Sequence, residues 1–328
     1  MSENYDRNVG RSDPQPPNLG GPRWGILYCP KKGIRADRKR WVKVQRALDL
    51  RHVQYDFVQS ESADSVERLM RMLINNGYKT IVIVGGDSAL NDAVNCLMDA
   101  DREVRESIAL GVIPNGVLND FARYWDFKEN EIQQTVDWLV KHRVRKVDLG
   151  CVSYKDEDGN DAKRYFLNCI NVGLIADVMN QRSQARSLLG SRTLAFFASI
   201  VMMAFHRLDY KMNIKINTDV ISRNVMTVCV GSGPGYGQTP NAVPYNGLVD
   251  VSVVYQPQKL MQLFAGLWLL VTGRFLNHRS VHPYRCREVL FKDTSRARVG
   301  IDGRLLGKLE GPYRITVEEE VVNFLIPD

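Results

Sequence analysis

The sequence lacks a hydrophobic run long enough to cross a membrane, and it lacks paired cysteines. Its two most apolar stretches, within 188–208 and 260–276, fall short of the roughly 20 apolar residues that a transmembrane helix needs. The six cysteines are widely spread, form no CxxC pair and mostly have apolar neighbours. Buried free thiols in a reducing cytoplasm therefore fit better than disulfides or a zinc site. No charged-then-apolar leader opens the chain, which argues against secretion.

The charge balance is modestly basic. Lysine and arginine number 44 against 37 aspartates and glutamates, a net charge of +7. This excess suits an anionic partner, either a membrane surface or a nucleic acid. No nucleic-acid recognition motif is present, and the positive charge is not interleaved with stacking aromatic residues. We therefore expect no nucleic-acid partner.

The first part of the chain alternates strands and helices after a polar tail. Residues 1–22 hold four prolines and three glycines and little to bury, which predicts a disordered tail. For residues 23–145, the patterning predicts strands at 24–29, 53–58, 80–84 and 109–113 and helices at 36–51, 62–76, around Leu90 and at 129–142. Such alternation is typical of a Rossmann-like three-layer α/β domain with an open parallel sheet.

Short strands dominate from residue 146 to residue 328. They are predicted at 144–154, 163–171, 210–217, 225–231, 248–254, 289–291, 298–301, 313–317 and 321–326. Asp158 and Gly159 mark a hairpin turn between the first two strands. The pattern predicts a mostly antiparallel β-sandwich domain, whose last strands can return to the first domain. The fold class expected for the whole chain is α/β plus β.

One stretch, Thr80–Asn95, carries the first functional signal. A strand rich in β-branched residues ends at Gly85 and Gly86, where glycine accepts a sharp exit without steric cost. Asp87 and Ser88 then stand where a helix begins. The start of a helix offers free N–H groups and the positive end of its dipole, which suits a phosphate group. An ordinary βα turn would give the same pattern and stays open.

Several short motifs follow one another along the chain. They are Cys29-Pro30-Lys31-Lys32-Gly33, Gly85-Gly86-Asp87-Ser88-Ala89 with Asn91-Asp92, the run PNGVLNDFAR from Pro114 to Arg123, Val147-Asp148-Leu149-Gly150, Asn171-Val172-Gly173, Gly235-Tyr236-Gly237 with Pro240-Asn241-Ala242, and Ile301-Asp302-Gly303-Arg304. In this order they resemble the motifs of the bacterial diacylglycerol kinase and related lipid kinase family. The first resembles its N-P-x-x-G turn, the second its GGDGT loop, the third its P-x-G-T-x-N-D-F-A-R loop and the last its DGE motif. The resemblance covers nearly everything from Trp24 to Asp328.

This resemblance implies a magnesium-dependent lipid kinase that binds ATP between its two domains and phosphorylates a lipid hydroxyl. It implies that the ATP phosphates lie across Gly85–Ser88 and Gly116–Asp120, and that Asp302 faces the lipid hydroxyl as general base. The implied nucleotide-binding residues are Gly85, Gly86, Asp87, Ser88, Asn91, Gly116, Asn119, Ser60 and Lys31, the catalytic residues are Asp302, Asp87 and Asp120, and the Mg²⁺ ligands are Asp87 and Asp120. An aspartate at such a position can also cap a helix or a turn, and for the two loop aspartates capping can be part of the role.

The chain departs from the family pattern at four places. The GGDGT loop ends in Ser88 and Ala89, and Val117 replaces the threonine of the second loop. Tyr245-Asn246 stands where the family has an acidic pair, which puts its β-domain magnesium site in doubt. Arg304 replaces the glutamate of the DGE motif, where it could bind a phosphate or a lipid head group or remain solvated.

Three functions fit these residues. An active lipid kinase acting on diacylglycerol or a sphingoid base is favoured, because the aspartates of both loops and of the late motif are all present. The alternative is a degenerate relative that binds nucleotide or lipid as a regulator, as the lost hydroxyls and acidic pair would suggest. A soluble-substrate kinase, such as an NAD kinase, is disfavoured by the two apolar stretches.

The second apolar stretch runs into a basic cluster between Arg274 and Arg287. A hydrophobic face beside positive charge is what an anionic membrane surface attracts. Core helices and a solvated basic face are the alternatives. We expect a cytoplasmic protein that associates peripherally with an anionic membrane and takes a membrane lipid as substrate; a homodimer is left open.

Overall fold

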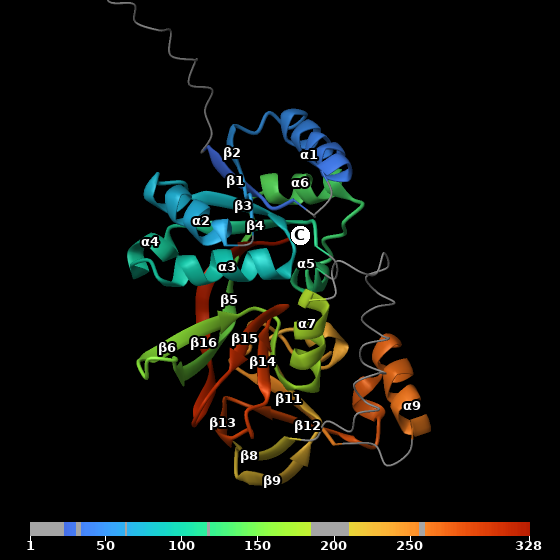
Figure 1. Ribbon diagram of the computed structural model, residues 1–328. Helices are drawn as coiled ribbons and strands as arrows, with labels where there is room; N and C mark the ends of the chain where they lie inside the picture. Colours follow the sequence, from blue (N-terminus) through green and yellow to red (C-terminus); the bar gives the residue numbers. More distant parts are fainter. Residues whose placement is uncertain (1–22, 31–33, 63, 117–118, 185–209, 256–259) are drawn as a thin grey trace, which may run out of the picture.

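A computed structural model gives the structure of residues 23–328 except 31–33, 63, 117–118, 185–209 and 256–259 (Figure 1). The expected tail at 1–22, the first apolar stretch at 188–208, Lys31 and Val117 lie outside these described residues. All six cysteines are free, and five of them are buried, as the composition predicted.

Strand and helix alternate through the first half of the structure. The elements are β1 (Trp24–Tyr28), α1 (Ile34–Asp49), β2 (Tyr55–Gln59), α2 (Ser65–Asn75), β3 (Thr80–Gly85), α3 (Asp87–Met98), α4 (Arg102–Glu106), β4 (Ala109–Pro114), α5 (Asp120–Tyr124) and α6 (Ile132–Val140). Strands β2, β1, β3 and β4 lie side by side in that order and are parallel. Helices α1 and α6 lie on one side of this sheet and α2 and α3 on the other (Figure 1). The predicted three-layer α/β fold is confirmed.

Burial explains why these strands are continuous apolar runs. Every residue of β1, β3 and β4 is buried, because helices cover both faces of the sheet. Helix α2 buries Val66, Leu69, Met70 and Leu73, which its 3.6-residue period places on one side. Parallel strands joined by crossover helices point the same way, so their carboxyl ends meet at one edge of the sheet.

The second half is built mainly of strands. The elements are β5 (Val144–Lys155), β6 (Asp161–Phe166), β7 (Cys169–Gly173), α7 (Leu174–Gln184), β8 (Tyr210–Ile216), β9 (Asp219–Val225), β10 (Thr227–Gly231), η2 (Gly235–Gly237), β11 (Val249–Val254), α9 (Leu260–Val271), η3 (Phe275–Asn277), β12 (Val281–Cys286), β13 (Glu288–Asp293), β14 (Arg298–Ile301), β15 (Arg304–Lys308) and β16 (Tyr313–Leu325). An antiparallel sheet in the order β12-β11-β10-β7-β14-β15 packs on strands of a second sheet through one apolar core. The predicted β-sandwich is confirmed.

The last strand joins the two halves. β16 pairs with β13 and β5, and its final residues lie parallel beside β4. The sequence predicted two strands here, at 313–317 and 321–326, but the structure has one continuous strand. It bends where Glu320 takes a left-handed φ of 52° and donates its N–H to Asp148 (2.9 Å).

The predicted strand at 163–171 is wrong in one respect, because it is two strands in two different sheets. β6 ends at Phe166 and β7 begins at Cys169. Between them the chain turns, and its N–H groups donate to Asp302 instead of to a neighbouring strand. Strands β9, β12 and β15 and helices α4, α5 and α7 were not predicted. The three strands lie at sheet edges and are rich in polar residues, so they carry little hydrophobic pattern.

Within the described ranges, no helix has the length and apolar character that crossing a bilayer requires. The second apolar stretch forms α9 and η3, which lie beside the sandwich (Figure 1).

Candidate functional site

The two glycine loops meet at the carboxyl edge of the parallel sheet. Gly86 follows β3, and Gly116 follows β4. A Cβ added to Gly86 would lie 2.7 Å from the Gly116 Cα, and one added to Gly116 would lie 2.5 Å from the Gly86 Cα. Only residues without a side chain allow two backbones to approach this closely. Two motifs that are 30 residues apart in the sequence therefore form one surface.

Helix α3 begins at this surface. Its N-cap is Gly86, whose carbonyl accepts the N–H groups of Ala89 and Leu90. The N–H groups of Asp87 and Ser88 precede these bonds and take no part in the helix ladder. With the positive end of the helix dipole, they make a favourable position for a phosphate group.

Two aspartates tie the loops together. The Asp87 carboxylate accepts the N–H groups of Asp120 (3.0 Å) and Phe121 (3.2 Å), so it caps α5 and not its own helix. The Asp120 carboxylate accepts the N–H of Tyr236 (2.7 Å) and pairs with Arg123 (2.5 Å). Both aspartates are nearly buried. Each of the four carboxylate oxygens accepts one of these hydrogen bonds, and Asp87 has a further one with the Asn168 side chain.

This pair of carboxylates suits a divalent cation. Burial, and then the charge of Asp120, raise the pKa of Asp87 to about 6. A cation between the two would offset their repulsion, and Mg²⁺ is commonly held by one or two carboxylates together with substrate phosphates. The residues that the structure describes include no group of three or more His, Cys, Asp or Glu side chains placed to hold a metal. Two carboxylates completed by phosphate oxygens are a donor set that fits Mg²⁺.

Asparagines shape the second loop from within. Asn119 has a left-handed φ of 53°, and its side-chain oxygen accepts the N–H of Gly116 (2.6 Å). Asn115 donates its N–H to the Gly85 carbonyl (2.7 Å) and its side-chain amide to the Cys29 carbonyl (3.1 Å). Asn119 therefore holds the loop in shape and does not extend from it toward a ligand.

The other residues expected to bind a nucleotide differ in how far they are buried and in where they lie. Ser60 is buried at the end of β2, where its side chain hydrogen-bonds Cys29 at the end of β1. Ser88 is half-buried in the first turn of α3. Asn91 is fully buried one turn later, and its side-chain amide donates to Asp302 in the late Asp302-Gly303-Arg304 (DGR) motif. Lys31 lies outside the described residues.

Asp302 is fully enclosed. It accepts hydrogen bonds from the N–H groups of Leu167 (2.7 Å), Asn168 (3.0 Å) and Cys169 (2.9 Å) and from the side-chain amide of Asn91 (2.9 Å). Two donors lie on each carboxylate oxygen, so all its lone pairs are engaged. Its exposed fraction is 0%. In this structure the Asp302 carboxylate faces the chain's own N–H groups, and its contact with a lipid hydroxyl stays a prediction.

The backbone of Asp302 is also unusual. Its φ is +43°, a region that residues other than glycine rarely adopt. Burial raises the pKa of its carboxyl to about 7, and the N–H donors of Leu167 and Cys169 act in the opposite direction. The hydrogen bonds to the 167–169 turn are what hold this conformation in place.

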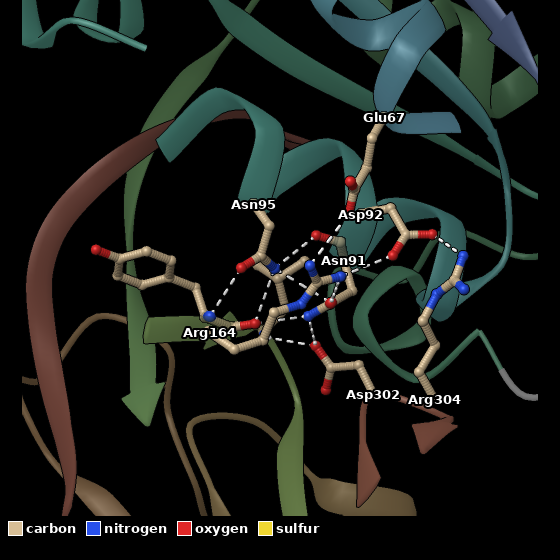
Figure 2. A network of polar contacts seen from close by, with 9 residues as sticks. Glu67, Asn91, Asp92, Asn95, Arg164, Asp302 and Arg304 are labelled. Atoms are coloured by element: carbon tan, nitrogen blue, oxygen red, sulfur yellow. Dashed lines mark hydrogen bonds and ion pairs between the residues drawn. The ribbon is translucent and has the colours of Figure 1, made fainter. Parts of the chain in front are cut away.

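Asn91 links the buried carboxylate to an ion-pair network (Figure 2). Its side-chain oxygen accepts a hydrogen bond from Arg164 (3.3 Å), which also pairs with Asp92 (2.8 Å) and Glu67 (3.1 Å). Arg304 pairs with the other oxygen of Asp92. The arginine that replaces the family's glutamate is thus held by α3, and the network joins the two halves of the molecule.

A pocket of about 370 Å³ opens beside this network. Three acidic and three basic side chains line it, together with Asn91, Tyr154 and the apolar Ile301, Leu305 and Leu306. Its walls come from α2 and α3 on one side and from β6, β14 and β15 on the other. The pocket is therefore amphipathic and lies between the two halves.

Two residues to which the sequence analysis gave no role in the site, Tyr236 and Arg164, also belong to it. Tyr236 has a left-handed φ of 57°, and its hydroxyl lies 3.3 Å from where a Cβ on Gly303 would stand. Its ring therefore extends from beside Asp120 to the DGR turn. Only the flanking glycines of the Gly-Tyr-Gly motif gave a sign of this tight backbone. Arg164 lies in a strand and gave no sign at all.

The place of the family's acidic pair is filled by an aromatic cluster. The Tyr245 ring lies 5.9 Å from that of Trp125, and the Arg145 guanidinium lies over it at 3.6 Å. The side chain of Asn246 accepts the N–H of Leu248 (3.1 Å). The pair Tyr245-Asn246 supplies no carboxylate, so a cation cannot be held here as it would be by two acids.

Comparisons with known proteins give the same two-part division. Residues 23–152 match the family described as diacylglycerol kinase catalytic domain, and residues 168–326 match the YegS C-terminal NAD kinase beta sandwich-like domain. A diacylglycerol kinase of Staphylococcus saprophyticus is 22% identical over 293 residues, which are 88% of this chain and 90% of that protein.

Solved structures share the fold. A diacylglycerol kinase from Bacillus anthracis str. Sterne superposes with a TM-score of 0.64 at 15% identity, over 93% of this chain and 97% of that one. Yeast NADH kinase complexed with NADH superposes with a TM-score of 0.52 at 11% identity, over 94% of this chain and 86% of that one. At such identities the likeness extends to the fold alone.

Proposed function

Because the chain belongs to the diacylglycerol kinase family, we propose that it is an ATP-dependent lipid kinase. It would transfer the γ-phosphoryl group to the hydroxyl of a membrane lipid, with diacylglycerol as the first acceptor to test and a sphingoid base as the second. The observation that carries this proposal is the contact between Gly86 and Gly116 at the start of α3, with Asp87 and Asp120 directly behind it.

The residues at this edge suit phosphoryl transfer, which needs phosphates held in place more than covalent help. The N–H groups of Asp87 and Ser88 would bind phosphate oxygens, and the glycine contact lets the backbone approach them closely. Mg²⁺ would be held by Asp87 and Asp120 together with those oxygens, and when bound it would supply positive charge against the phosphates. No hydroxyl-bearing residue follows Ser88, because Ala89 stands where the family has threonine.

The acceptor hydroxyl requires a carboxylate with a free lone pair. Asp302 has none in this structure, so we assign it the role of a positioning residue that holds the 167–169 turn and Asn91. Asp87 is hydrogen-bonded by the N–H groups of Asp120 and Phe121 and by the Asn168 side chain, which leaves one of its four carboxylate lone pairs free, at the start of α3. We therefore propose that Asp87 orients the hydroxyl.

The alternative is a relative that binds nucleotide or lipid without turnover. It is favoured by Ala89 in the first loop and by the aromatic cluster of Tyr245, Trp125 and Arg145 at the position of the acidic pair. Such a regulator would still bind Mg·ATP at the glycine loops, so binding alone does not separate the two. Turnover does.

The test is transfer of labelled γ-phosphate from ATP into a mixed-lipid extract. The wild-type chain should produce a labelled phospholipid, and Asp87→Asn should reduce the rate about 100-fold or more. Asp302→Asn, assayed where its melting curve shows it folded, should stay within about tenfold of wild type. Asp250→Asn, which alters an ion pair with Arg285 in the sandwich, is the matched control.

Three outcomes would revise the proposal. No labelled lipid under conditions where Mg·ATP binds would favour the regulator. A folded Asp302→Asn protein as inactive as Asp87→Asn would restore Asp302 as the general base. A labelled soluble product would indicate a soluble-substrate kinase.

A further inference from the structure

Helix α9 (Leu260–Val271) carries the two most exposed large apolar side chains of the described residues. Met261 is 82% exposed and Trp268 is 69% exposed. Ala265 and Thr272 are exposed as well, so positions 261, 265, 268 and 272 form one stripe at helical spacing. An exposed tryptophan on such a stripe is costly in water, and a polar residue would serve a purely solvated helix better. We therefore expect this stripe to be covered by a binding partner.

The opposite side of α9 is anchored to the protein. Leu270 packs against a small core around Phe275, and a ring nitrogen of His278 lies 2.8 Å from the Gln262 carbonyl. A Cβ on Gly266 would be in ordinary contact with the His278 ring at 3.7 Å. The helix is thus fixed along one side, and its outward face does not result from a loose attachment.

The length and composition of α9 suit a bilayer surface. Its 12 residues include no charged side chain, and it is about 18 Å long, too short to span the hydrocarbon core. An apolar segment of this length is typical of a buried core helix or of a helix in the membrane interface, and the exposure of Met261 and Trp268 favours the interface. Tryptophan is favoured there because its ring is apolar and its N–H can bond to water or head groups.

Positive charge stands at the end of the same helix. Arg274 and Arg279 are exposed, and no acidic side chain of the described residues pairs with either. By contrast, Arg285 pairs with Asp250 (2.6 Å), so its charge is already balanced. The charge available beside α9 is therefore basic, which is complementary to anionic lipid head groups.

We infer that α9 is the face by which the protein docks on an anionic bilayer. Met261 and Trp268 enter the boundary between head groups and acyl chains, and Arg274 and Arg279 face the head groups. This inference rests on the proposed function for its purpose, since the bilayer would supply the lipid acceptor. It names a surface that is separate from the glycine loops and the late motif (Figure 1).

The test is co-sedimentation of the full chain with phosphatidylcholine vesicles that contain about one third phosphatidylglycerol, and with pure phosphatidylcholine vesicles. We expect binding to the anionic vesicles only, with loss at 0.5 M salt. Trp268→Gln should weaken the partition about tenfold. Arg274→Gln and Arg279→Gln should each weaken it about fivefold.

Matched controls are Val220→Gln and Arg296→Gln, which alter exposed residues elsewhere on the sandwich and should bind as wild type. Trp268→Gln should also keep its turnover of a short-chain diacylglycerol dispersed as monomers, because the active site is untouched. This arm separates docking from catalysis. If wild type binds vesicles through Trp268 but phosphorylates no lipid, the proposed function fails and the docking face stands.

Unchanged vesicle binding by Trp268→Gln would overturn the inference, and so would equal binding of wild type to neutral and anionic vesicles. A third contrary result is a wild-type dimer in light scattering that Trp268→Gln dissociates while vesicle binding is unaffected. In that case the stripe would be an interface between two copies of the chain.

Discussion

Two groups of backbone N–H donors among the described residues differ in what they hold: those at the start of α3 and those of the 167–169 turn. At the start of α3, the N–H groups of Asp87 and Ser88 lie outside the helix ladder beside a contact between two glycines. At the 167–169 turn, three successive N–H groups converge on Asp302, a carboxylate of the same chain. The first arrangement can receive an anionic ligand, and the second already contains its anion.

This difference changes the role of the late aspartate. A carboxylate that is surrounded by donors stabilises the fold and the position of its neighbours, and it cannot accept a further proton without losing a hydrogen bond. Asp302 holds Asn91, which joins the network of Arg164, Asp92 and Arg304. The turn is therefore connected to α3 through Asn91, as the proposed positioning role of Asp302 requires.

The largest effect on activity should come from a side chain placed at the contact between Gly86 and Gly116. In Gly116→Ala, the new Cβ would lie 2.5 Å from both the Gly86 Cα and the Asn119 side-chain oxygen. The loops must separate, which should lower phosphoryl transfer about 100-fold or more and the free energy of unfolding by about 1–3 kcal/mol. Lipid labelling and urea unfolding measure the two effects. Gly159→Ala, at a left-handed position with open space around it, should leave activity unchanged; equal losses in both variants would contradict this account.

A change at Asp302, in the 167–169 turn, should lower the free energy of unfolding. Asp302→Asn puts an amide N–H₂ against two of the four N–H donors, and unsatisfied buried donors should cost about 2–4 kcal/mol of unfolding free energy. Urea unfolding measures the loss. Asp250→Asn, in a partly exposed ion pair with Arg285, should lose less than about 1 kcal/mol. A fully stable Asp302→Asn protein would show that the turn does not depend on its anion.

A smaller effect is expected where the turn connects to α3. A double-mutant cycle of Arg304→Ala with Asp92→Asn should give a coupling energy of about 1–2 kcal/mol, because Asp92 is only 3% exposed in this pair. The exposed pair of Arg296 and Glu310 should couple by less than about 0.5 kcal/mol. Equal coupling in the two cycles would mean that Arg304 is merely a surface charge.

The smallest effect is a pH dependence at the loops. The pKa of Asp87 is raised to about 6 in the folded chain, above its unfolded value, so its contribution to stability is present at low pH and is lost as pH rises through 6. Between pH 5.5 and 7.5 this should remove about 1 kcal/mol of unfolding free energy. Denaturant unfolding at both pH values should show a smaller change in Asp87→Asn than in wild type or Asp250→Asn. An unchanged difference would place the titration elsewhere.

Much of the fold was predictable because its signals are local. The alternation of strand and helix, the spacing of Val66, Leu69, Met70 and Leu73 in α2 and the glycines after β3 all depend on neighbouring residues. The predictions that failed concern segments whose structure depends on a residue far away in the sequence. The sequence could not show that the strand at 163–171 breaks, because the acceptor of its N–H groups lies more than 130 residues away at Asp302.

The candidate site divides in the same way. The glycine loops were predicted from two contiguous motifs, and the topology of the parallel sheet brings such loops to one edge. The burial of Asp302, the pairing of Arg304 with Asp92 and the part played by Tyr236 depend on how the two halves pack against each other. No pattern within one segment carries that information.

Amide hydrogen exchange of the full chain, with and without Mg·ATP, distinguishes the glycine loops from the 167–169 turn. We expect Mg·ATP to slow exchange in a peptide covering 85–90, where the N–H groups of Asp87 and Ser88 lie outside the helix ladder. We expect no change across 166–170, because the N–H groups of Leu167, Asn168 and Cys169 already donate to Asp302. Protection at 166–170 with none at the glycine loops, or no protection at either place under conditions where ATP binds, would contradict the account.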